Sequence, residues 1–377
     1  MIKKVSTAIV GGGIIGMTIA LELALRDIDS MIIDEPTSSK TTAAAAGMIA
    51  PISEAVFNEG TLIKPNLHAQ QLWSVLADRL TELTGNESSL SNIPSLLIAK
   101  TKDDKAIIDN LVNYYEQCNL KIEKLSNLQC GDVLAGLTPN FNSGALLLSD
   151  YFVEPLKELH LIETAYRKLG GEITNSTATS LDINLSQITL SNNDIIEAKD
   201  IVLATGNSGA EILGQKYASK LQVIKVKGQI MTLKLNETAI KLERVLRGFV
   251  KGTPVYLVPR SGDELVVGAT QEYTGFEIGN TVEGLFNLIE PAISLFPSLR
   301  DAEIKSIGHG FRPGTVDNIA YIGRIASTNI ICAFGHYRHG VLQAPLTAEI
   351  VADEIQGESN QFVEIFSPNR ADLTQSV

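Results

Sequence analysis

The chain has 377 residues, more than one small hydrophobic core organises, so we expect two domains. It carries 31 Lys and Arg against 43 Asp and Glu, a net charge of −12, and it has no long basic run. This balance argues against nucleic acid or an anionic membrane surface as a partner. A small anionic ligand would need a local arginine to attract it.

Three cysteines, Cys118, Cys130 and Cys332, are dispersed along the chain, and none lies in a Cys-x-x-Cys pair. Such a set is typical of packed thiols in a reducing compartment and argues against disulfides or a metal site. We therefore expect a cytoplasmic protein without a bound metal. The apolar stretch 8–25 resembles a signal peptide only superficially, because glycines at 11–13 and Glu22 interrupt it. We expect no membrane insertion.

The hydrophobic spacing predicts elements in a mixed α/β order. A strand at 5–10, a helix at 14–25 and a strand at 30–34 would form a β-α-β unit typical of a parallel sheet. The later elements are an Ala-rich helix opening at 42–48, helices at 65–84, 103–118, 154–169, 283–289 and 341–355, and strands at 93–99, 201–204, 255–258, 265–267, 304–312, 319–322 and 330–334. The β-rich middle indicates a substrate domain inserted into a discontinuous cofactor domain.

The strongest motif follows the first strand. Gly11, Gly13 and Gly16 match G-x-G-x-x-G at the opening of a helix, and Asp34 ends the second strand. Here Gly11 permits the tight turn, Gly13 lets the backbone approach a pyrophosphate at the helix N-terminus, and Gly16 allows close helix–strand packing. Asp34 would accept hydrogen bonds from the adenosine ribose. The sequence therefore predicts a Rossmann-like dinucleotide site.

The motif alone does not separate FAD from a nicotinamide cofactor. A second buried strand at 201–204 runs into Thr205 and Gly206, an Ala-Thr-Gly ending typical of flavoproteins where the chain passes FAD again. The chain has no second G-x-G-x-x-G for a nicotinamide cofactor. These observations favour FAD.

Nine segments, in chain order, together resemble the glycine oxidase branch of the D-amino-acid oxidase family, which includes the glycine oxidase of thiamine biosynthesis. They are GGGIIG (11–16), TTAAAAGM (41–48), VEP (153–155), VKGQ (226–229), YLVPR (256–260), VVGAT (266–270), GFRPGT (310–315), YIGR (321–324) and GHYRHG (335–340). The resemblance implies a D-amino-acid oxidase-like or glutathione reductase-like fold. It places the FAD domain at 1–90, 145–220 and 301–377, and the substrate domain at 91–144 and 221–300.

The resemblance also implies the cofactor contacts, with FAD bound noncovalently because no cysteine matches a covalent attachment site. Residues placed at the pyrophosphate and adenosine are Ile14, Ile15, Asp34, Glu35, Thr41, Thr42 and Ala178. Residues placed near the flavin ring are Ala46, Gly47, Met48, His336, Tyr337, Arg338, His339, Gly340, Val341 and Leu342. The last group opens a helix, whose positive dipole end would favour negative charge on a reduced flavin.

Three residues are implied at the substrate. Arg312 would hold an amino-acid carboxylate with its planar fork of donors, and Tyr256 would donate its hydroxyl to the same group. Arg338 matches an arginine near the substrate. The chain departs from the family at Pro254, where a His occurs, and at Gln271, where a Met occurs. Side-chain preference is therefore open.

The activity implied is oxidation of a small amino acid or amine to the imino acid, with dioxygen reduced to hydrogen peroxide, by a homo-oligomer. Two alternatives stay open. One is a D-amino-acid dehydrogenase of the same fold that passes electrons to a quinone or protein. The other is a flavin-binding protein without turnover, although Arg312 and Tyr256 argue against it.

Overall fold

The computed structural model describes residues 2–35, 41–137, 143–237, 239–273 and 279–372. Its first sheet is built on the predicted β-α-β unit, in which β1 (Ile2–Val10) is followed by α1 (Ile14–Leu25) and β2 (Ser30–Asp34). The strand order is β17-β18-β11-β1-β2-β8, with β10 and β9 attached to β11. The other strands are β8 (Glu172–Asn175), β9 (Ala178–Asp182), β10 (Gln187–Leu190), β11 (Ile195–Leu203), β17 (Tyr321–Arg324) and β18 (Ile330–Phe334).

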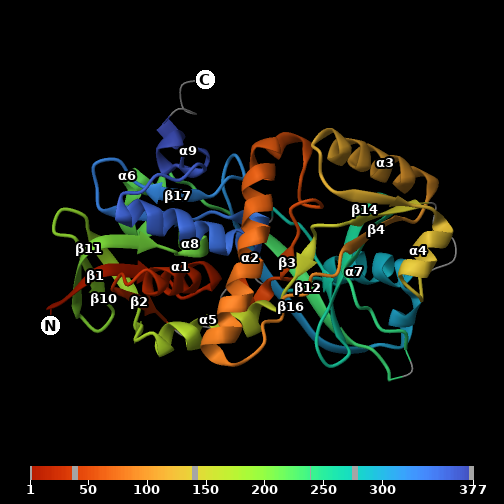
Figure 1. The fold of residues 1–377 in the computed structure, drawn as a ribbon, viewed down its shortest axis with the longest axis horizontal. Coiled ribbons are helices and arrows are strands. Elements are labelled where there is room, and N and C mark those ends of the chain that lie inside the picture. The colour runs from red at the N-terminus through yellow and green to blue at the C-terminus, as the bar shows by residue number, and fades with distance from the viewer. Residues whose placement is uncertain (1, 36–40, 138–142, 238, 274–278, 373–377) are drawn as a thin grey trace.

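Side-chain alternation along β1 divides the core of this half. Ile9 packs into the cluster beneath the helices, whereas Ala8 and Val10 pack on the opposite face. Helices pack against one another over the first face, with α1 contacting both α8 and α5 (Figure 1). The covering helices are α1, α2 (Ile63–Thr84), α5 (Pro155–Lys168) and α8 (Gly340–Gln356).

The second sheet has the order β16-β12-β15-β14-β13-β4-β6-β5. Its strands are β4 (Ser95–Ala99), β5 (Ile122–Leu125), β6 (Ser143–Leu147), β12 (Ile224–Lys234), β13 (Leu246–Val250), β14 (Thr253–Pro259), β15 (Glu264–Gly268) and β16 (Glu303–Gly314). Helix α7 (Val282–Leu295) covers one face and α3 (Lys102–Gln117) the other (Figure 1). A short α4 (Asn127–Val133) completes this half, and a two-stranded sheet of β3 (Met48–Ile49) and β7 (Tyr151–Phe152) packs against the cores of both halves.

The predicted helix opening at 42–48 is wrong. The chain makes a short 3₁₀ turn at Thr41–Ala44 and then enters β3. Gly47 breaks the helix because its φ is +78°, and a Cβ there would lie 2.1 Å from the carbonyl oxygen of Val153. Strand 319–322 lies two residues later than predicted, at Tyr321–Arg324.

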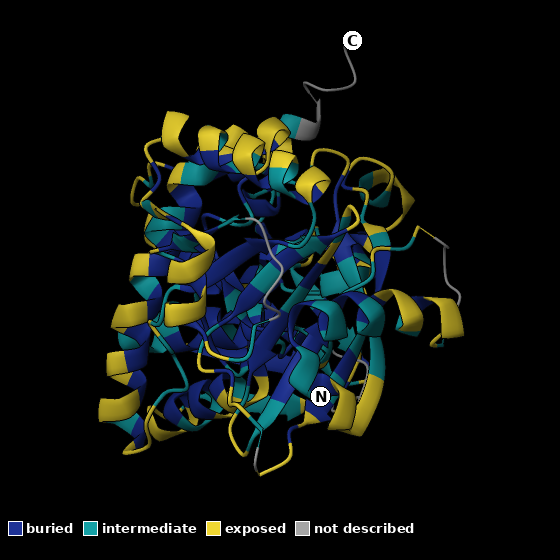
Figure 2. Ribbon diagram, turned by 90° about the vertical axis from the view of Figure 1, so that its right-hand side faces the viewer, coloured by how far each residue is buried: buried dark blue, intermediate teal, exposed yellow. Residues whose placement is uncertain are grey.

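The α/β architecture with a β-rich second half is confirmed by the two sheets. The exact domain limits stay a prediction, and strands β6 and β16 extend the second sheet across the predicted limits at residues 145 and 301. Figure 2 shows buried strands inside and exposed residues on the outer helices. Among the described helices, none combines the length and apolar character needed to cross a membrane.

Candidate active site

A cavity of about 640 Å³ lies where the ends of the first sheet meet the second sheet. The carboxyl ends of β1, β2 and β18 reach it at Val10, Asp34 and Phe334, and β12, β14 and β16 supply Gly228, Tyr256 and Arg312 from the other side. Open α/β sheets bind ligands at the carboxyl ends of their parallel strands. The two halves of the fold therefore combine at one site.

The glycine turn after β1 has the predicted geometry. Gly11 has φ +111°, and a Cβ there would lie 2.4 Å from the carbonyl oxygen of Ala204. A Cβ on Gly16 would lie 1.9 Å from the carbonyl oxygen of Gly11, so this position is a packing contact. At Gly13 a Cβ would meet only the Thr42 hydroxyl, at 3.5 Å. Gly13 therefore leaves open space at the start of α1, where a phosphate would approach.

The N-terminus of α1 is held by neighbouring side chains rather than by a cap of its own. The Gly12 amide donates to the Asp34 carboxylate at 2.8 Å, and the Ile14 amide donates to the Thr42 hydroxyl at 3.2 Å. The first turn of the helix contains no acidic residue. This leaves a positive helix end facing the cavity, as an anion site requires.

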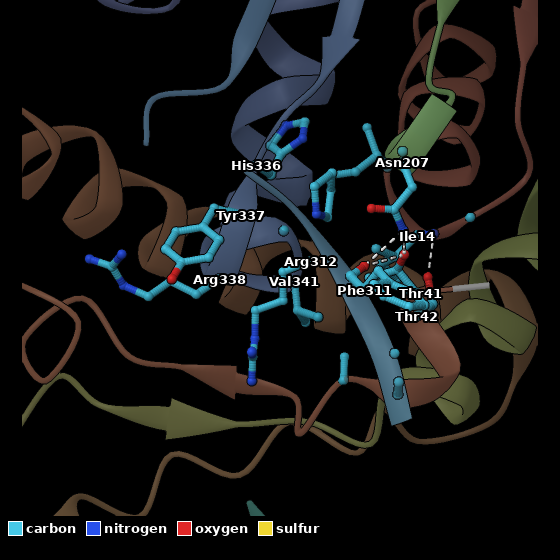
Figure 3. Close-up of a pocket in the computed structure, with 18 of the residues that line it drawn as sticks. Ile14, Thr41, Thr42, Asn207, Phe311, Arg312, His336, Tyr337, Arg338 and Val341 are labelled. Atoms are coloured by element: carbon cyan, nitrogen blue, oxygen red, sulfur yellow. Dashed lines mark hydrogen bonds between the residues drawn. The ribbon is translucent and has the colours of Figure 1, made fainter. Parts of the chain in front are cut away.

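Asn207, in the turn after β11, was missed by the sequence reasoning. Its amide nitrogen donates to the Thr41 hydroxyl at 3.0 Å and to the Phe311 carbonyl at 2.8 Å (Figure 3). Its Oδ1 is buried and has no hydrogen-bond partner within the described part of the chain. Asn207 thus ties the cofactor side of the cavity to the strand that carries Arg312, and it presents a spare acceptor there.

The predicted loop after β18 lines the other end of the cavity. His336 is buried, accepts or donates one hydrogen bond with Thr347 at 2.9 Å, and has its pKa lowered to about 3 by burial and by nearby His339. It is therefore neutral at physiological pH. Gly340, Val341 and Leu342, at the start of α8, also line the cavity.

Arg312 lies on β16 beside Gly228 of β12, which has no side chain. Its Nη1 donates to the Thr270 carbonyl at 3.0 Å, and a Cβ on Gly228 would lie 2.6 Å from the same nitrogen. The guanidinium therefore occupies the space that the missing Gly228 side chain leaves. In a similar way, a Cβ on Gly268 would lie 2.5 Å from the Tyr256 hydroxyl. Burial raises the pKa of Tyr256, so its hydroxyl keeps its proton and can donate.

The other two arginines of the cavity are neutralised by acids. Glu54 lies 2.8 Å from Arg247 through one carboxylate oxygen and 2.8 Å from Arg338 through the other. Arg338 also pairs with Glu59. Figure 3 shows the Arg338 side chain directed away from that of Arg312. Arg338 therefore lies in the cavity wall with its charge balanced, and its contact with a substrate stays a prediction.

The structure brings the remaining predicted site residues together, while their contacts with FAD stay a prediction. All but Gly16 line the one cavity; besides those above they are Ile15, Glu35, Ala46, Gly47, Met48, Ala178, Thr205, Gly206, Tyr337, His339 and Leu342. Glu54 and Arg247 were missed, although each is a charged residue in a mostly apolar stretch. Within the described residues, no cluster of three His, Cys, Asp or Glu could hold a metal.

The charge on Glu54 should stabilise the fold. Burial would raise its pKa, but Arg247 and Arg338 lower it from 4.5 to about 2. A lowered pKa gives stability that is complete above pH 4.5 and is lost as the pH falls towards 2, and a shift of this size corresponds to about 3 kcal/mol. We expect Glu54→Gln to lower the free energy of unfolding at pH 7 by about that amount, measured by urea titration.

The control for this prediction is Glu283→Gln, at an exposed position in α7, which should change little. The deficit of Glu54→Gln should shrink as the pH falls from 4.5 to 3, because Glu54 takes up a proton in the unfolded wild-type chain below pH 4.5 but in the folded protein only near pH 2. A deficit that stays constant over this range would show that the charge of Glu54 is not what stabilises the fold.

These features define a class of protein. The cavity has a glycine turn of the dinucleotide-binding type, a second helix end at its far side, and an arginine that can pair with a carboxylate. Together these features are those of a flavin-dependent oxidoreductase. The family model described as FAD dependent oxidoreductase, the D-amino-acid oxidase type, matches residues 6–354. The chain belongs to this family.

Within the family, the chain is similar to proteins of the glycine oxidase group. It is 31% identical to a bifunctional ThiO/ThiG protein of Synechocystis sp., over 96% of this chain and 53% of that protein. It is 27% identical to a glycine oxidase of Geobacillus kaustophilus over 96% of both chains. The crystal structure of glycine oxidase from G. kaustophilus matches with a TM-score of 0.87 at 25% identity, over 97% of this chain and 99% of that one. The chain spans about half the length of its bifunctional relatives.

The residues present fit FAD. The open space at Gly13 and the start of α1, which has no cap from its own N-cap residue, suit a pyrophosphate, and the spare acceptor of Asn207 suits a hydroxyl or N–H donor. The start of α8, which also lacks a side-chain cap, suits the electron-rich edge of a reduced flavin. The pyrophosphate and the flavin edge therefore each have complementary groups in the cavity wall.

Proposed function

We propose that the protein oxidises glycine, or another small amino acid or amine, to the imino acid and reduces dioxygen to hydrogen peroxide. The single observation that supports this most is the state of Arg312. It lines the cavity, and none of the described carboxylates forms an ion pair with it, whereas Arg247 and Arg338 are both paired. An unneutralised guanidinium in a partly buried pocket favours an anionic ligand.

The chain would bind and orient the substrate. Arg312 would pair with the carboxylate, and the Tyr256 hydroxyl would donate a hydrogen bond to it, which fixes the α-carbon in place. The amine must be neutral, because its lone pair forms the C=N bond as the α-hydrogen leaves as hydride. Bound FAD supplies the hydride acceptor and passes the electrons to dioxygen. Water then hydrolyses the imino acid to the keto acid and ammonia.

Side-chain preference would be set at two positions. Pro254 and Gln271, where the chain departs from the family pattern, both line the cavity. Neither residue carries a charge, so a second charged group on the substrate would find no partner there. This favours small monocarboxylate substrates.

The FAD would be held noncovalently. None of the three cysteines lines the cavity, and Cys130 and Cys332 are buried elsewhere. Heat precipitation should therefore release all of the yellow colour into the supernatant; colour that stays with the pellet would contradict noncovalent binding.

The proposed activity can be tested by dioxygen consumption. Purified protein should consume dioxygen and form hydrogen peroxide with at least one of glycine, sarcosine and D-alanine. Consumption only when a quinone or dye is added would favour a dehydrogenase of the same fold. Failure of every amine to bleach the flavin without dioxygen would favour a flavin-binding protein without turnover.

Three broader predictions accompany this proposal. The relatives named ThiO/ThiG support a role of the imino product in building the thiazole of thiamine, which growth of a deletion strain without thiamine would test. A cytoplasmic location and a homo-oligomeric state are expected from the sequence. Cell fractionation and light scattering of the purified protein would test these two predictions.

A further inference from the structure

The Arg312 guanidinium is held by a backbone carbonyl and also lies against the Tyr256 hydroxyl. Its Nη1 donates to the Thr270 carbonyl at 3.0 Å, and β12 gives it room but no polar partner at Gly228. Thr270 belongs to the segment that follows β15, outside any regular strand. A loop carbonyl can fix a guanidinium only if the loop itself is held in place.

Thr270 is held against β12 by both its backbone and its side chain. The Gln229 amide donates to the Thr270 hydroxyl at 2.8 Å, and the Thr270 amide donates to the Gln229 carbonyl at 3.2 Å. The Thr270 hydroxyl in turn donates to the carboxylate of Glu272. Two residues further on, Glu272 exchanges backbone hydrogen bonds with Lys227 at 2.9 and 3.0 Å.

Glu272 is the centre of this network. One of its oxygens accepts from the Gln229 side chain at 2.7 Å, and the other lies 3.3 Å from the buried ammonium of Lys227. Although burial would raise the pKa of Glu272, hydrogen bonds from Thr270 and Gln229 lower it, so the carboxylate stays charged. Each of these contacts holds the loop against β12.

Gln229 connects the network to α7. It is fully buried, donates to the Thr281 hydroxyl at 3.0 Å and accepts from the Thr281 amide at 2.8 Å. Thr281 is the N-cap of α7. The loop that holds Arg312 is therefore tied to both a strand and a helix of the second sheet.

We infer that Gln229 and Glu272 are positioning residues for Arg312, acting through the Thr270 carbonyl. Gln229, Glu272 and Lys227 do not line the cavity, so they have no direct contact with a substrate there. Successive residues of β12 have different functions. Gly228 leaves room for the Arg312 guanidinium, and its neighbours Lys227 and Gln229 hold the loop that contains Thr270. This inference rests on the proposed role of Arg312 in binding a carboxylate.

The test compares Glu272→Ala and Gln229→Ala with wild-type holoenzyme. We expect KM for glycine to rise about 5- to 50-fold, a range typical of coupled neighbours, with a smaller change in kcat and unchanged FAD content. Acetate, a carboxylate without an amine, should bind more weakly by a similar factor, followed through the flavin absorbance. Anaerobic flavin reduction by ethylamine, which has no carboxylate, should keep its rate.

Two further variants sharpen the comparison. Glu272→Gln keeps an acceptor for Thr270 and Gln229 but not the charge that faces Lys227, so it should recover part of the loss, even if the alanine variants fold poorly. Glu283→Ala, at an exposed position in the first turn of α7, is the matched control and should behave as wild type. In an Arg312→Ala background, Glu272→Ala should have almost no added effect on acetate binding.

The outcomes separate the inference from the proposed function. The positioning role would be overturned if both alanine variants kept the wild-type KM for glycine and the wild-type affinity for acetate, while Arg312→Ala had a large effect. Equal losses with glycine and ethylamine would also overturn it, since these indicate a general structural role. No effect of Arg312→Ala itself would instead overturn the proposed carboxylate site.

Discussion

Replacement of Arg312 with alanine should lower kcat/KM for glycine by a factor of about 30 to several thousand. The reason is that a desolvated carboxylate would lose its charged partner, which typically costs about 2–5 kcal/mol. FAD content should not change, because Arg312 contacts Thr270 and lies over Gly228, and it does not contact the glycine turn at the start of α1. Steady-state kinetics and the flavin-to-protein ratio measure both parts.

The control variant is Arg312→Lys. It keeps the positive charge but not the planar fork, so it should recover only part of the activity. An amine without a carboxylate should be oxidised slowly and at nearly the same rate by wild type and Arg312→Ala. If both kinds of substrate lost activity equally, Arg312 would be structural and the amino-acid assignment would lose its main support.

The second large effect is expected at Gly13. A valine there should abolish FAD binding, and with it all activity, because its side chain would fill the space next to the α1 N-terminus. The protein should still fold, since a Cβ at Gly13 would meet only the Thr42 hydroxyl, at 3.5 Å. Flavin absorbance after purification and circular dichroism of the same sample test the two statements.

The contrast with other glycines makes this prediction specific. Gly131→Val, in α4, is the matched control because a Cβ there meets nothing within 4 Å, and it should retain FAD. Gly16→Val should instead prevent folding, since its Cβ would lie 1.9 Å from the Gly11 carbonyl oxygen. A fully flavinylated Gly13→Val protein would contradict the cofactor site proposed here.

The elements that the sequence predicts well are those with local signals. The β-α-β unit and α8 have regular apolar spacing and glycine turns, so their positions follow from residues close in the chain. The segment 42–48 shows the limit of such signals. Its alanines favour a helix, but contacts with the distant residue Val153 require Gly47 to adopt a left-handed conformation.

The part of the site that the sequence reasoning missed depends on distant pairings. Glu54 and Arg247 are separated by 193 positions in the chain, and they meet only because the fold packs the turn after β3 against β13. Arg312 and Tyr256 could be predicted because each lies in a recognisable motif. The glycines opposite them, Gly228 and Gly268, also lie in such motifs, but their function as spaces for the two side chains appears only in the structure.

The most direct test of the central claim is anaerobic mixing of the purified yellow protein with glycine. The flavin absorbance should be bleached in the absence of dioxygen, and admission of air should restore the colour and form hydrogen peroxide. Sarcosine and D-alanine in parallel would rank the substrates. A flavin that stays oxidised with all three would contradict the assignment of this cavity as the active site of an amino-acid oxidase.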